Sequence, residues 1–320
     1  MPADILTVTL NPTLDVSTSV DRLINHAKLR CSTEQEQVGG GGINVAQVIH
    51  SLGGHCQAML PAGGTRGQEI MTRLNDSGLS LVTTTIDQQN RECFNVFESS
   101  TGHEYRFVLP GPTLSVAEQD ACIAAVLETL PTQFLVLSGS LPPGVPDDFY
   151  AQLIRAVRAK APHLPVVLDA SGQALRHALD AGVYLFKPSG EELGALIGQT
   201  PATTLDCVAS CRALIRQGKA QIVALTLGAQ GSIMVTDTHA WQVKPLPVPV
   251  TSTVGAGDSF VGGLVWSLTQ TPDLEQAARI ATACSGAALQ TQGALRFDKQ
   301  HVLSISQSVQ VEPVSLPAAR

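Results

Sequence analysis

The stretch TSTVGAGDSFVGGL, at residues 251–264, places one carboxylate directly after three residues with almost no side chain. Gly255, Ala256 and Gly257 leave their backbone amides uncovered, and an apolar helical pattern begins at Asp258. Backbone amides at the start of a helix attract anions. A carboxylate beside an anion site suits phosphoryl transfer, in which positioning and charge stabilisation supply most of the catalysis. The alternative for Asp258 is a helix N-cap, a common use of aspartate.

A second glycine-rich stretch, GGGGINVAQVI, begins at Gly39 and leads into another helical pattern. Glycines let the backbone come close to a ligand, and the helix start again offers free amides. We interpret this run as a binding loop in preference to a flexible turn. It is not a P-loop because no Gly-Lys-Ser/Thr ends it, and its spacing does not match a dinucleotide fingerprint. The missing fingerprint argues against a nicotinamide oxidoreductase.

Apolar runs of strand length alternate with helical patterns along most of the chain. This alternation predicts an α/β fold, with a parallel sheet covered by helices on both faces. The runs FLVL, PVVLD and IVALTL are apolar throughout, as buried parallel strands are. Predicted strands span residues 5–10, 57–62, 134–137, 166–169, 184–187 and 222–227. Predicted helices span residues 43–52, 68–75, 116–130, 148–160, 174–181 and 205–217.

Residues 13–37 and 91–108 break this pattern, because they are more polar and alternate with period two. ECFNVFES and HEYRFVL flank the turn signal STG, which predicts a β-hairpin. We interpret the two segments as a small β-sheet lid within a single domain covering residues 1–320. An exposed edge strand of such a lid needs cover, which favours a homodimer formed through the lid. The tail after Ser304 shows little periodicity, and fraying is expected there.

The composition argues against several other classes of protein. Hydrophobic residues make up 44% of the 320, enough for a large core, and a net charge of −7 without a long basic run gives no support for nucleic-acid binding. The chain shows no signal peptide and no apolar run near the ~20 residues of a membrane span. Seven cysteines without a disulfide pattern indicate a reducing cytoplasm. Cys207 and Cys211 are interpreted as packing residues on one side of a helix, not as metal ligands.

The motifs GGGGINVA and STVGAGDSFVGG resemble the two signature regions of the ribokinase-like sugar kinases of the PfkB family. The resemblance extends from LTVTLNPTLD to TQGA. Within the family, AKLRC, YRFVLPGP, SGSLPPGV, DASGQAL and LGAQG are similar to segments of the minor bacterial 6-phosphofructokinases, and tagatose-6-phosphate kinases and 1-phosphofructokinases share much of the pattern. The resemblance implies a doubly wound, mostly parallel sheet, a β-sheet lid often used for dimerisation, and MgATP-dependent phosphorylation of a sugar hydroxyl.

The resemblance also assigns the catalytic residues. Asp258 would be the catalytic base, and Gly255, Ala256 and Gly257 would form the anion hole. An exposed aspartate has a pKa of ~3.9 and is ionised at pH 7. Such a weak base suffices when the proton leaves late in a loose transition state.

The sugar would be bound by Asp15 in NPTLD and by Gly40, Gly41 and Asn44 in the glycine loop. Ser140 follows a strand end, where ligands sit on such sheets.

The phosphate of the acceptor would need cations from the lid segments. Guanidinium groups match phosphate oxygens, so Arg91 and Arg106 are the favoured residues, followed by Lys28 and then Arg30. This basic set argues against ribose, adenosine or another unphosphorylated acceptor.

The nucleotide side follows from the same resemblance. Lys187 in FKPSGEE would lie near the ATP phosphates, and Thr226, Gly228 and Gly231 would line the nucleotide pocket. Glu192 would act on Mg²⁺ through water, since Mg²⁺ keeps much of its hydration. The alternative for Glu192 is a solvent-facing helix carboxylate, and a monovalent cation is left open as a further cofactor.

Two positions depart from the family pattern. Ser189 stands where the family usually has Asn after Lys-Pro, which puts direct participation of this residue in metal and phosphate binding in doubt. Thr291 stands where similar kinases carry Asn beside the adenine.

The expected reaction is conversion of fructose 6-phosphate to fructose 1,6-bisphosphate by ATP. Tagatose 6-phosphate is the near alternative, because it differs at one stereocentre that no motif reads, and fructose 1-phosphate is a third. A protein that binds sugar phosphate as a regulator, without turnover, is the alternative from another class, and Ser189 is the one feature in its favour.

Overall fold

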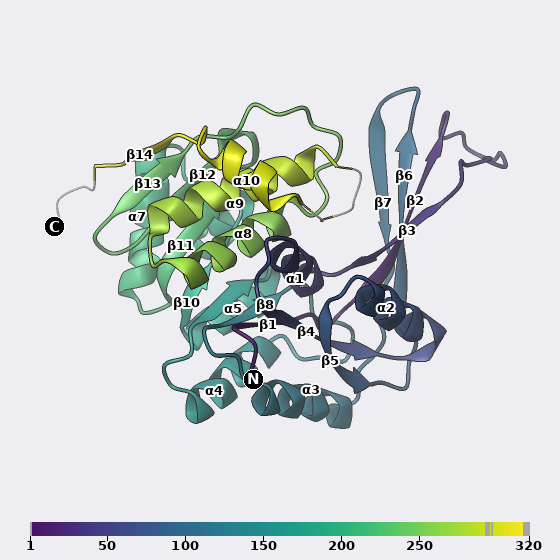
Figure 1. Ribbon diagram of the computed structural model, residues 1–320, viewed down its shortest axis with the longest axis horizontal. Helices are drawn as coiled ribbons and strands as arrows, with labels where there is room; N and C mark the ends of the chain where they lie inside the picture. Colours follow the sequence, from purple (N-terminus) through teal and green to yellow (C-terminus); the bar gives the residue numbers. More distant parts are fainter. Residues whose placement is uncertain (1, 292–294, 296, 316–320) are drawn as a thin grey trace.

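The computed structural model describes residues 2–291, 295 and 297–315, and a large sheet runs through its centre (Figure 1). The strands of this sheet are β1 (Ile5–Val8), β4 (Cys56–Ala62), β5 (Ser80–Thr85), β8 (Phe134–Ser138), β9 (Val166–Asp169), β10 (Val183–Phe186), β11 (Ala220–Thr226), β12 (Ser232–Val235), β13 (Ala240–Val243) and β14 (Val311–Pro313). Within the described residues their order is β14-β13-β12-β11-β10-β9-β8-β1-β4-β5. The strands from β11 to β5 run parallel, and β12, β13 and β14 extend the edge beyond β11 in antiparallel fashion.

Helices cover both faces of the sheet. One face packs against α1 (Gly41–Ser51), α2 (Gly64–Asp76), α8 (Ala256–Gln270), α9 (Leu274–Leu289) and α10 (Lys299–Ser306). The other face packs against α3 (Val116–Glu128), α4 (Phe149–Lys160), α5 (Gly172–Asp180), α6 (Gly190–Ile197) and α7 (Thr204–Arg216). The predicted fold class is therefore confirmed.

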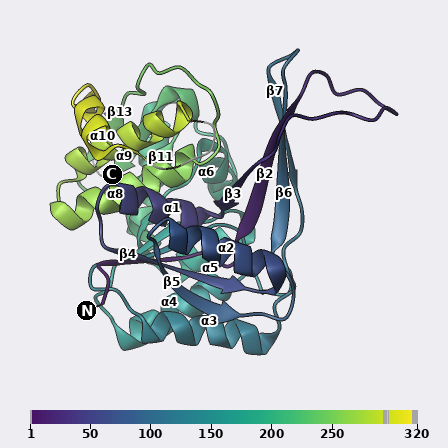
Figure 2. The same cartoon turned by 45° about the vertical axis from the view of Figure 1, so that its right-hand side comes forward.

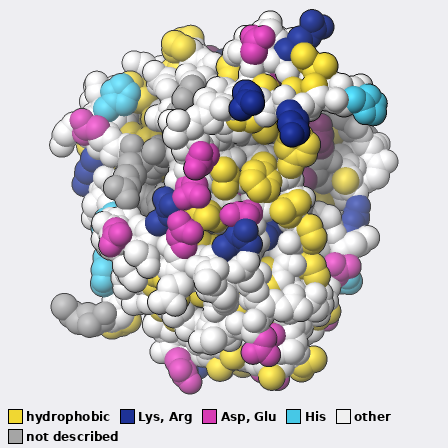
Figure 3. Space-filling model, turned by 90° about the vertical axis from the view of Figure 1, so that its right-hand side faces the viewer, with side chains coloured by type: hydrophobic (Ala, Val, Ile, Leu, Met, Phe, Trp, Pro, Cys, Tyr) yellow, Lys and Arg dark blue, Asp and Glu magenta, His cyan; other side chains and the backbone are white. Residues whose placement is uncertain are grey.

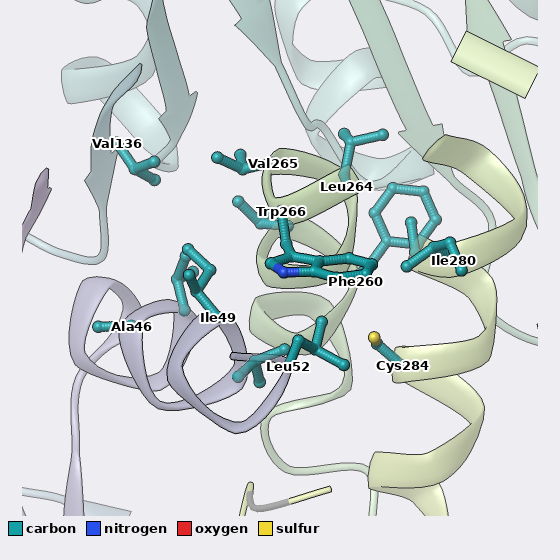
Figure 4. Close-up of a cluster of buried hydrophobic side chains, with 14 of the residues drawn as sticks. Ala46, Ile49, Leu52, Val136, Phe260, Leu264, Val265, Trp266, Ile280 and Cys284 are labelled. Atoms are coloured by element: carbon teal, nitrogen blue, oxygen red, sulfur yellow. The ribbon is translucent and has the colours of Figure 1, made fainter. Parts of the chain in front are cut away.

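Successive side chains along a strand point to opposite faces of the sheet, so the one sheet packs against a hydrophobic cluster on each side. Ile5 of β1 belongs to the cluster under α1 and α8, and its neighbour Leu6 belongs to the cluster on the opposite face. Figure 4 shows the first cluster, in which Trp266 of α8 lies among side chains of α1 and α9. Cys207 and Cys211 of α7 are buried in the second cluster, as predicted for packing residues.

A second, smaller sheet projects from the core (Figure 2). Its strands are β2 (Thr13–Val20), β3 (Gln35–Gly39), β6 (Arg91–Glu98) and β7 (His103–Val108), in the order β3-β2-β6-β7. We call this sheet the lid. The predicted hairpin is β6–β7, in which Phe94 lies opposite Phe107. The two central strands, β2 and β6, run parallel.

Ion pairs connect the lid to α2. Arg66 Nη2 lies 2.5 Å from Glu92 Oε2 of β6, and Arg73 pairs with Glu36 of β3 as well as with Glu69 of its own helix. Two different lid strands are thus attached to one helix of the core.

The predicted strands and helices all have counterparts, but several elements were not predicted. These are β5, β12, β13, β14, α6, α9 and α10. The expectation of fraying after Ser304 is wrong for the described part of the tail, because α10 continues to Ser306 and β14 pairs with β13, with Val311 opposite Val243. A three-residue strand is too short to show periodicity in the sequence. Residues 316–320 lie outside the described part.

Among the helices that the structure describes, none combines the length and the apolarity required to cross a membrane.

Candidate active site

The carboxyl ends of the parallel strands meet at one edge of the sheet, and candidate site residues follow them. Asp169 ends β9, Lys187 follows β10 and Thr226 ends β11. The first turns of α1 and α8 reach the same edge and contact each other through Asn44 and Asp258. Open α/β sheets bind their ligands at this edge.

The start of α8 is built to expose its amides. The helix begins at Ala256, so Asp258 is its third residue, and the predicted alternative of an N-cap role is excluded. The N-cap is Gly255, which has a left-handed φ of 75° and whose added Cβ would lie 2.8 Å from Leu295 Cδ1. Glycine alone meets both demands. Because no side chain caps these amides, the first turn can bind an anion beside the carboxylate of Asp258.

A distant residue holds the carboxylate of Asp258. Asn44 Nδ2 donates a hydrogen bond of 2.7 Å to Asp258 Oδ2. Asn44 lies in the first turn of α1, where Thr9 Oγ1 accepts a hydrogen bond of 2.7 Å from the amide of Ile43. The predicted sugar ligand and the predicted base are therefore direct partners in this structure.

The pKa of Asp258 differs from the value expected for an exposed side chain. Burial raises this pKa to about 7, and the negative charge of Asp169 adds to the effect. The hydrogen bond from Asn44 and the charges of Lys187 and Arg106 act in the opposite direction. The expectation of a pKa of ~3.9 is wrong because the carboxylate lies among packed atoms near a second carboxylate. A pKa near the working pH suits a general base.

A buried ion pair supplies positive charge next to α8. Lys187 is 8% exposed, and its Nζ lies 3.1 Å from Asp169 Oδ1. Burial by itself would lower the pKa of Lys187, but the negative charges of Asp169, Glu192 and Asp258 outweigh it and raise the pKa above its usual value. A Cβ added to Gly257 would lie 3.7 Å from Lys187 Nζ, so the ammonium lies beside the first turn of α8. Sequence reasoning missed Asp169, although it ends a predicted strand.

Close packing explains the glycine run Gly39–Gly42. A Cβ on Gly41 would clash with Ser138 Oγ at the end of β8, and a Cβ on Gly42 would lie 2.6 Å from the carbonyl oxygen of Val8. The run therefore lies directly against the ends of two strands. This contact brings the first turn of α1, with Asn44, to the site.

A cleft of about 670 Å³, which we call the nucleotide-side cleft, begins at the first turn of α8. It is large enough for a nucleotide. The predicted nucleotide residues Thr226, Gly228 and Gly231 line it together with Ala256 and Gly257. Its apolar walls include Leu227, Pro245, Leu246, Phe260 and Leu289.

The two departures from the family pattern have local explanations. Ser189 is the N-cap of α6 and forms a capping box with Glu192, whose amide donates to Ser189 Oγ at 3.2 Å and whose Oε2 accepts from the Ser189 amide at 2.7 Å. Glu192 is thus held in place and does not simply face solvent. Thr291 lies just beyond the end of α9, and its Oγ1 donates a hydrogen bond of 3.0 Å to the carbonyl of Ala288. Thr291 is not among the residues that line the nucleotide-side cleft.

A second cleft, of about 660 Å³, lies between the lid and the segment from Val250 to Val254, and we call it the lid-side cleft. Asp15 and Arg106 both line it, with Arg106 Nη2 3.9 Å from Asp15 Oδ2. Burial raises the pKa of Asp15, and the charge of Arg106 opposes this rise. Asp15 Oδ1 is buried without a hydrogen-bond partner among the described residues, so it is available to a hydroxyl.

The other predicted cations are placed differently. Arg91 donates to the backbone carbonyls of Leu109 and Asn11, at 3.2 Å each, where the lid joins the core. Lys28 and Arg30 are exposed in the loop between β2 and β3, which projects at the end of the lid away from the core (Figure 2).

Asn11, which sequence reasoning did not single out, contacts the predicted site residue Ser140. Its Nδ2 donates to Ser140 Oγ at 3.3 Å, and its Oδ1 is buried without a partner in the described part of the chain. The signal was present, since Asn11 directly follows the first strand in LNPTLD, but an asparagine before proline is also a common turn residue.

An α/β core with a lid and an anion-binding helix start defines a sugar-kinase architecture, and the chain belongs to the pfkB family of carbohydrate kinases, whose family model matches residues 10–300. The predicted resemblance is confirmed. Ribokinase from Arabidopsis thaliana shares the fold, with a TM-score of 0.75 at 20% identity over 96% of this chain and 99% of that one.

The curated relatives include phosphofructokinases of two kinds. The chain is 38% identical to ATP-dependent 6-phosphofructokinase isozyme 2 of Mycobacterium tuberculosis (strain ATCC 25618 / H37Rv) over 299 residues, 93% of this chain and 87% of the relative. It is also 38% identical to the isozyme 2 of Escherichia coli (strain K12) over 290 residues, 90% of this chain and 93% of the relative. A 1-phosphofructokinase of Vibrio cholerae is 31% identical over 317 residues, 97% of each chain.

Solved structures of phosphofructokinase-2 from Escherichia coli are closely similar. The complex with fructose-6-phosphate has a TM-score of 0.89 and 35% identity, covering 96% of this chain and 99% of that one. The same protein was solved in complex with potassium, with a TM-score of 0.90, and in a tetrameric inhibited form, with a TM-score of 0.89.

Proposed function

We propose that this protein is an ATP-dependent 6-phosphofructokinase that converts fructose 6-phosphate to fructose 1,6-bisphosphate. The observation that supports this most directly is the place of Asp258. Asp258 directly follows Ala256 and Gly257, which line the nucleotide-side cleft, and the charge of Arg106, which lines the lid-side cleft, lowers the pKa of its carboxyl. An acceptor hydroxyl and a phosphoryl group from two clefts would meet at such a carboxylate.

In the proposed reaction, the 1-hydroxyl oxygen of the sugar forms a bond to the γ-phosphorus of ATP. The bond from that phosphorus to the bridging oxygen breaks, and ADP leaves with the electron pair. Asp258 orients the hydroxyl for in-line attack and accepts its proton. The amides around Gly255, Ala256 and Gly257 stabilise the charge on the transferred group, and Lys187 adds a positive charge beside them.

The acceptor would occupy the lid-side cleft. Asp15, with its unpartnered oxygen, would accept hydrogen bonds from sugar hydroxyls, and Asn44 would contribute from α1 together with the backbone of Gly40 and Gly41. Arg106 would bind the 6-phosphate. Ser140, at a strand end, would add a further contact, whereas Arg91 binds backbone carbonyls and Lys28 lies in the loop at the far end of the lid, so neither is among the residues that line this cleft.

The nucleotide would occupy the other cleft, against Thr226, Gly228 and Gly231. Mg²⁺ would be held by the ATP phosphates and, through water, by the carboxylates of Asp169 and Glu192, an all-oxygen set that suits this ion. When bound it would neutralise phosphate charge. Both carboxylates lie close enough to the site to shift the pKa of its residues. Asp169 raises the pKa of Asp258, and Glu192 raises the pKa of Lys187. A monovalent cation is a second candidate cofactor, because the Escherichia coli relative was solved with potassium.

We further propose a homodimer formed through the lid, in the cytoplasm. β7 is exposed along its whole length and ends the lid sheet, so it is an unprotected edge. Figure 3 looks onto this side of the molecule and shows apolar side chains among charged ones. The exposed apolar residues of the lid and its edge include Phe94, Phe97, Tyr105, Phe107, Val108 and Leu109. Free cysteines are consistent with a reducing compartment.

The test is ADP release by purified protein with MgATP and, separately, fructose 6-phosphate, tagatose 6-phosphate, fructose 1-phosphate or fructose. We expect turnover with fructose 6-phosphate above the others, and its loss in Asp258→Ala with sugar-phosphate binding retained. Preference for another phosphosugar would change the substrate but keep the reaction. Binding of phosphosugar without turnover in the wild type would favour the regulator alternative, and turnover retained in Asp258→Ala would overturn the role of Asp258.

A further inference from the structure

Helix α9 presents one face to the nucleotide-side cleft. Thr282, Ser285, Gly286 and Leu289 all line this cleft, and their spacing of i, i+3, i+4 and i+7 puts them in one stripe along the helix. Across the cleft lie Pro245 and Leu246, among others. A Cβ on Gly286 would lie 3.2 Å from Leu246 Cδ1, so Leu246 packs directly against Gly286 and leaves no room for a larger residue at this point. We call the part of the cleft along this stripe the slot.

One end of the slot lies near the anion-binding first turn of α8, and the other end lies farther along α9. The amide of Thr251, just before α8, donates to the carbonyl of Leu289 at 2.7 Å, so this end of α9 lies near the approach to α8. Farther along, a Cβ on Gly263 of α8 would meet Cys284 Sγ at 2.7 Å. Thr282 is therefore on the far side of the slot from the anion-binding turn, about 10 Å along the helix from Leu289.

Two hydroxyls at this cleft have no partner. Thr282 is 8% exposed and Ser232 is 4% exposed, and Thr282 Oγ1 and Ser232 Oγ are buried without a hydrogen bond among the described residues. A threonine in a helix can satisfy its hydroxyl on the carbonyl one turn back, but Thr282 does not. A buried hydroxyl without a partner costs free energy, so both are suited to a polar ligand edge.

We propose, resting on the kinase function above, that Thr282 reads the purine base of the nucleotide through a hydrogen bond to the 6-position. With the phosphates at the first turn of α8, a base in the slot points the edge farthest from its ribose toward Thr282. The 6-amino group of adenine is on that edge and donates, and the threonine hydroxyl accepts. Ser232, which also lines the cleft, offers a second hydroxyl. Thr282 is thus a specificity-determining residue for the phosphoryl donor.

The experiment compares the binding of ATP and of purine riboside triphosphate, which lacks the 6-amino group, by calorimetry with Mg²⁺. The wild type should bind ATP about three- to tenfold more tightly, the factor that one hydrogen bond supplies. Thr282→Val, which keeps the shape and removes the hydroxyl, should bind ATP weaker by a similar factor and treat both nucleotides alike. Thr282→Ser should behave as the wild type.

Equal binding of the two nucleotides by the wild type would overturn the inference without the use of any variant. So would a preference for ATP that persists in Thr282→Val. Failure to bind either nucleotide would instead overturn the kinase proposal, so the two failures are distinguishable. The fructose 6-phosphate affinity should be the same in all variants, since Thr282 does not line the lid-side cleft.

Discussion

The side chain of Asn44 donates its 2.7 Å hydrogen bond to Asp258 across 214 positions of sequence, and so joins the first turn of α1 to the first turn of α8. One helix carries the proposed base, and the other is held against the ends of β1 and β8 by its glycine run. The position of the carboxylate therefore depends on the sheet as well as on its own helix. This dependence can be tested.

Replacement of Asn44 should move the pH dependence of the reaction. The hydrogen bond from Asn44 lowers the pKa of Asp258, which burial has raised to about 7. Asn44→Ala removes this stabilisation of the charged form, so the pKa of Asp258 should rise. As the pH is lowered, activity should therefore be lost at a higher pH than in the wild type. Asn44→Asp, which adds a negative charge, should shift the acid limb of kcat/KM further still. A profile that drops in height without moving would contradict this role of Asn44.

The ionised carboxylate of Asp258 should lower the free energy of unfolding at neutral pH. Because its pKa is raised from 3.8 to about 7 in the folded protein, the folded state holds a proton that the unfolded chain has released between these values. The free energy of unfolding should therefore fall as pH rises from 4 to 7. Asp258→Asn cannot ionise, so it should be more stable than the wild type by about 4 kcal/mol at pH 8, since each unit of the pKa rise corresponds to about 1.4 kcal/mol, and nearly equal at pH 4. Urea denaturation at the two pH values measures the difference.

The matched control for this measurement is Asp120→Asn. Asp120 is exposed on α3, so its replacement should change the free energy of unfolding little at either pH. A gain in stability for Asp258→Asn that is the same at pH 4 and pH 8 would contradict the raised pKa.

Removal of both charges of the Lys187–Asp169 ion pair should abolish turnover but change the free energy of unfolding little. Lys187→Met leaves the Asp169 carboxylate buried and unpaired, which should cost roughly 3–5 kcal/mol. The double variant Lys187→Met/Asp169→Leu removes both charges and should recover most of the lost free energy of unfolding, yet remain inactive. Thermal melts and ADP release measure the two properties. Recovery of turnover along with stability would show that the pair has only a structural role.

A charge on the lid should separate the proposed dimer. Phe107 is 50% exposed on β7, and Phe107→Glu would place a carboxylate in an apolar interface. The variant should sediment as a monomer in analytical ultracentrifugation. Val116→Glu is the control, because Val116 is 72% exposed on α3, away from the lid. A dimer that survives Phe107→Glu, or a wild type that is monomeric, would exclude this interface.

Sequence reasoning succeeded where the signal is local. The apolar runs predicted the parallel strands except the more polar β5, and GAGDS predicted a helix start with uncovered amides. The pairing of Asn44 with Asp258 could not be predicted, because periodicity does not report which helix starts converge. The raised pKa of Asp258 could not be predicted from the sequence either, because its burial and its closeness to Asp169 arise only in the folded chain. Arg91 was predicted as a phosphate ligand from its guanidinium and its place in a lid segment that resembles phosphosugar kinases, and in the structure its guanidinium donates to backbone carbonyls.

The parallel pairing of β2 with β6 has a consequence for how the molecule folds. Thr13 lies opposite Arg91, and between them the chain passes through β3, α1, β4, α2 and β5. Closing so long a loop costs chain entropy, and local contacts within the lid cannot offset it. We therefore expect the sheet that carries Asp15 and Arg106 to assemble only after the first half of the core has formed. It should be the first region to lose amide protection in mild denaturant, well before the strands at the centre of the large sheet.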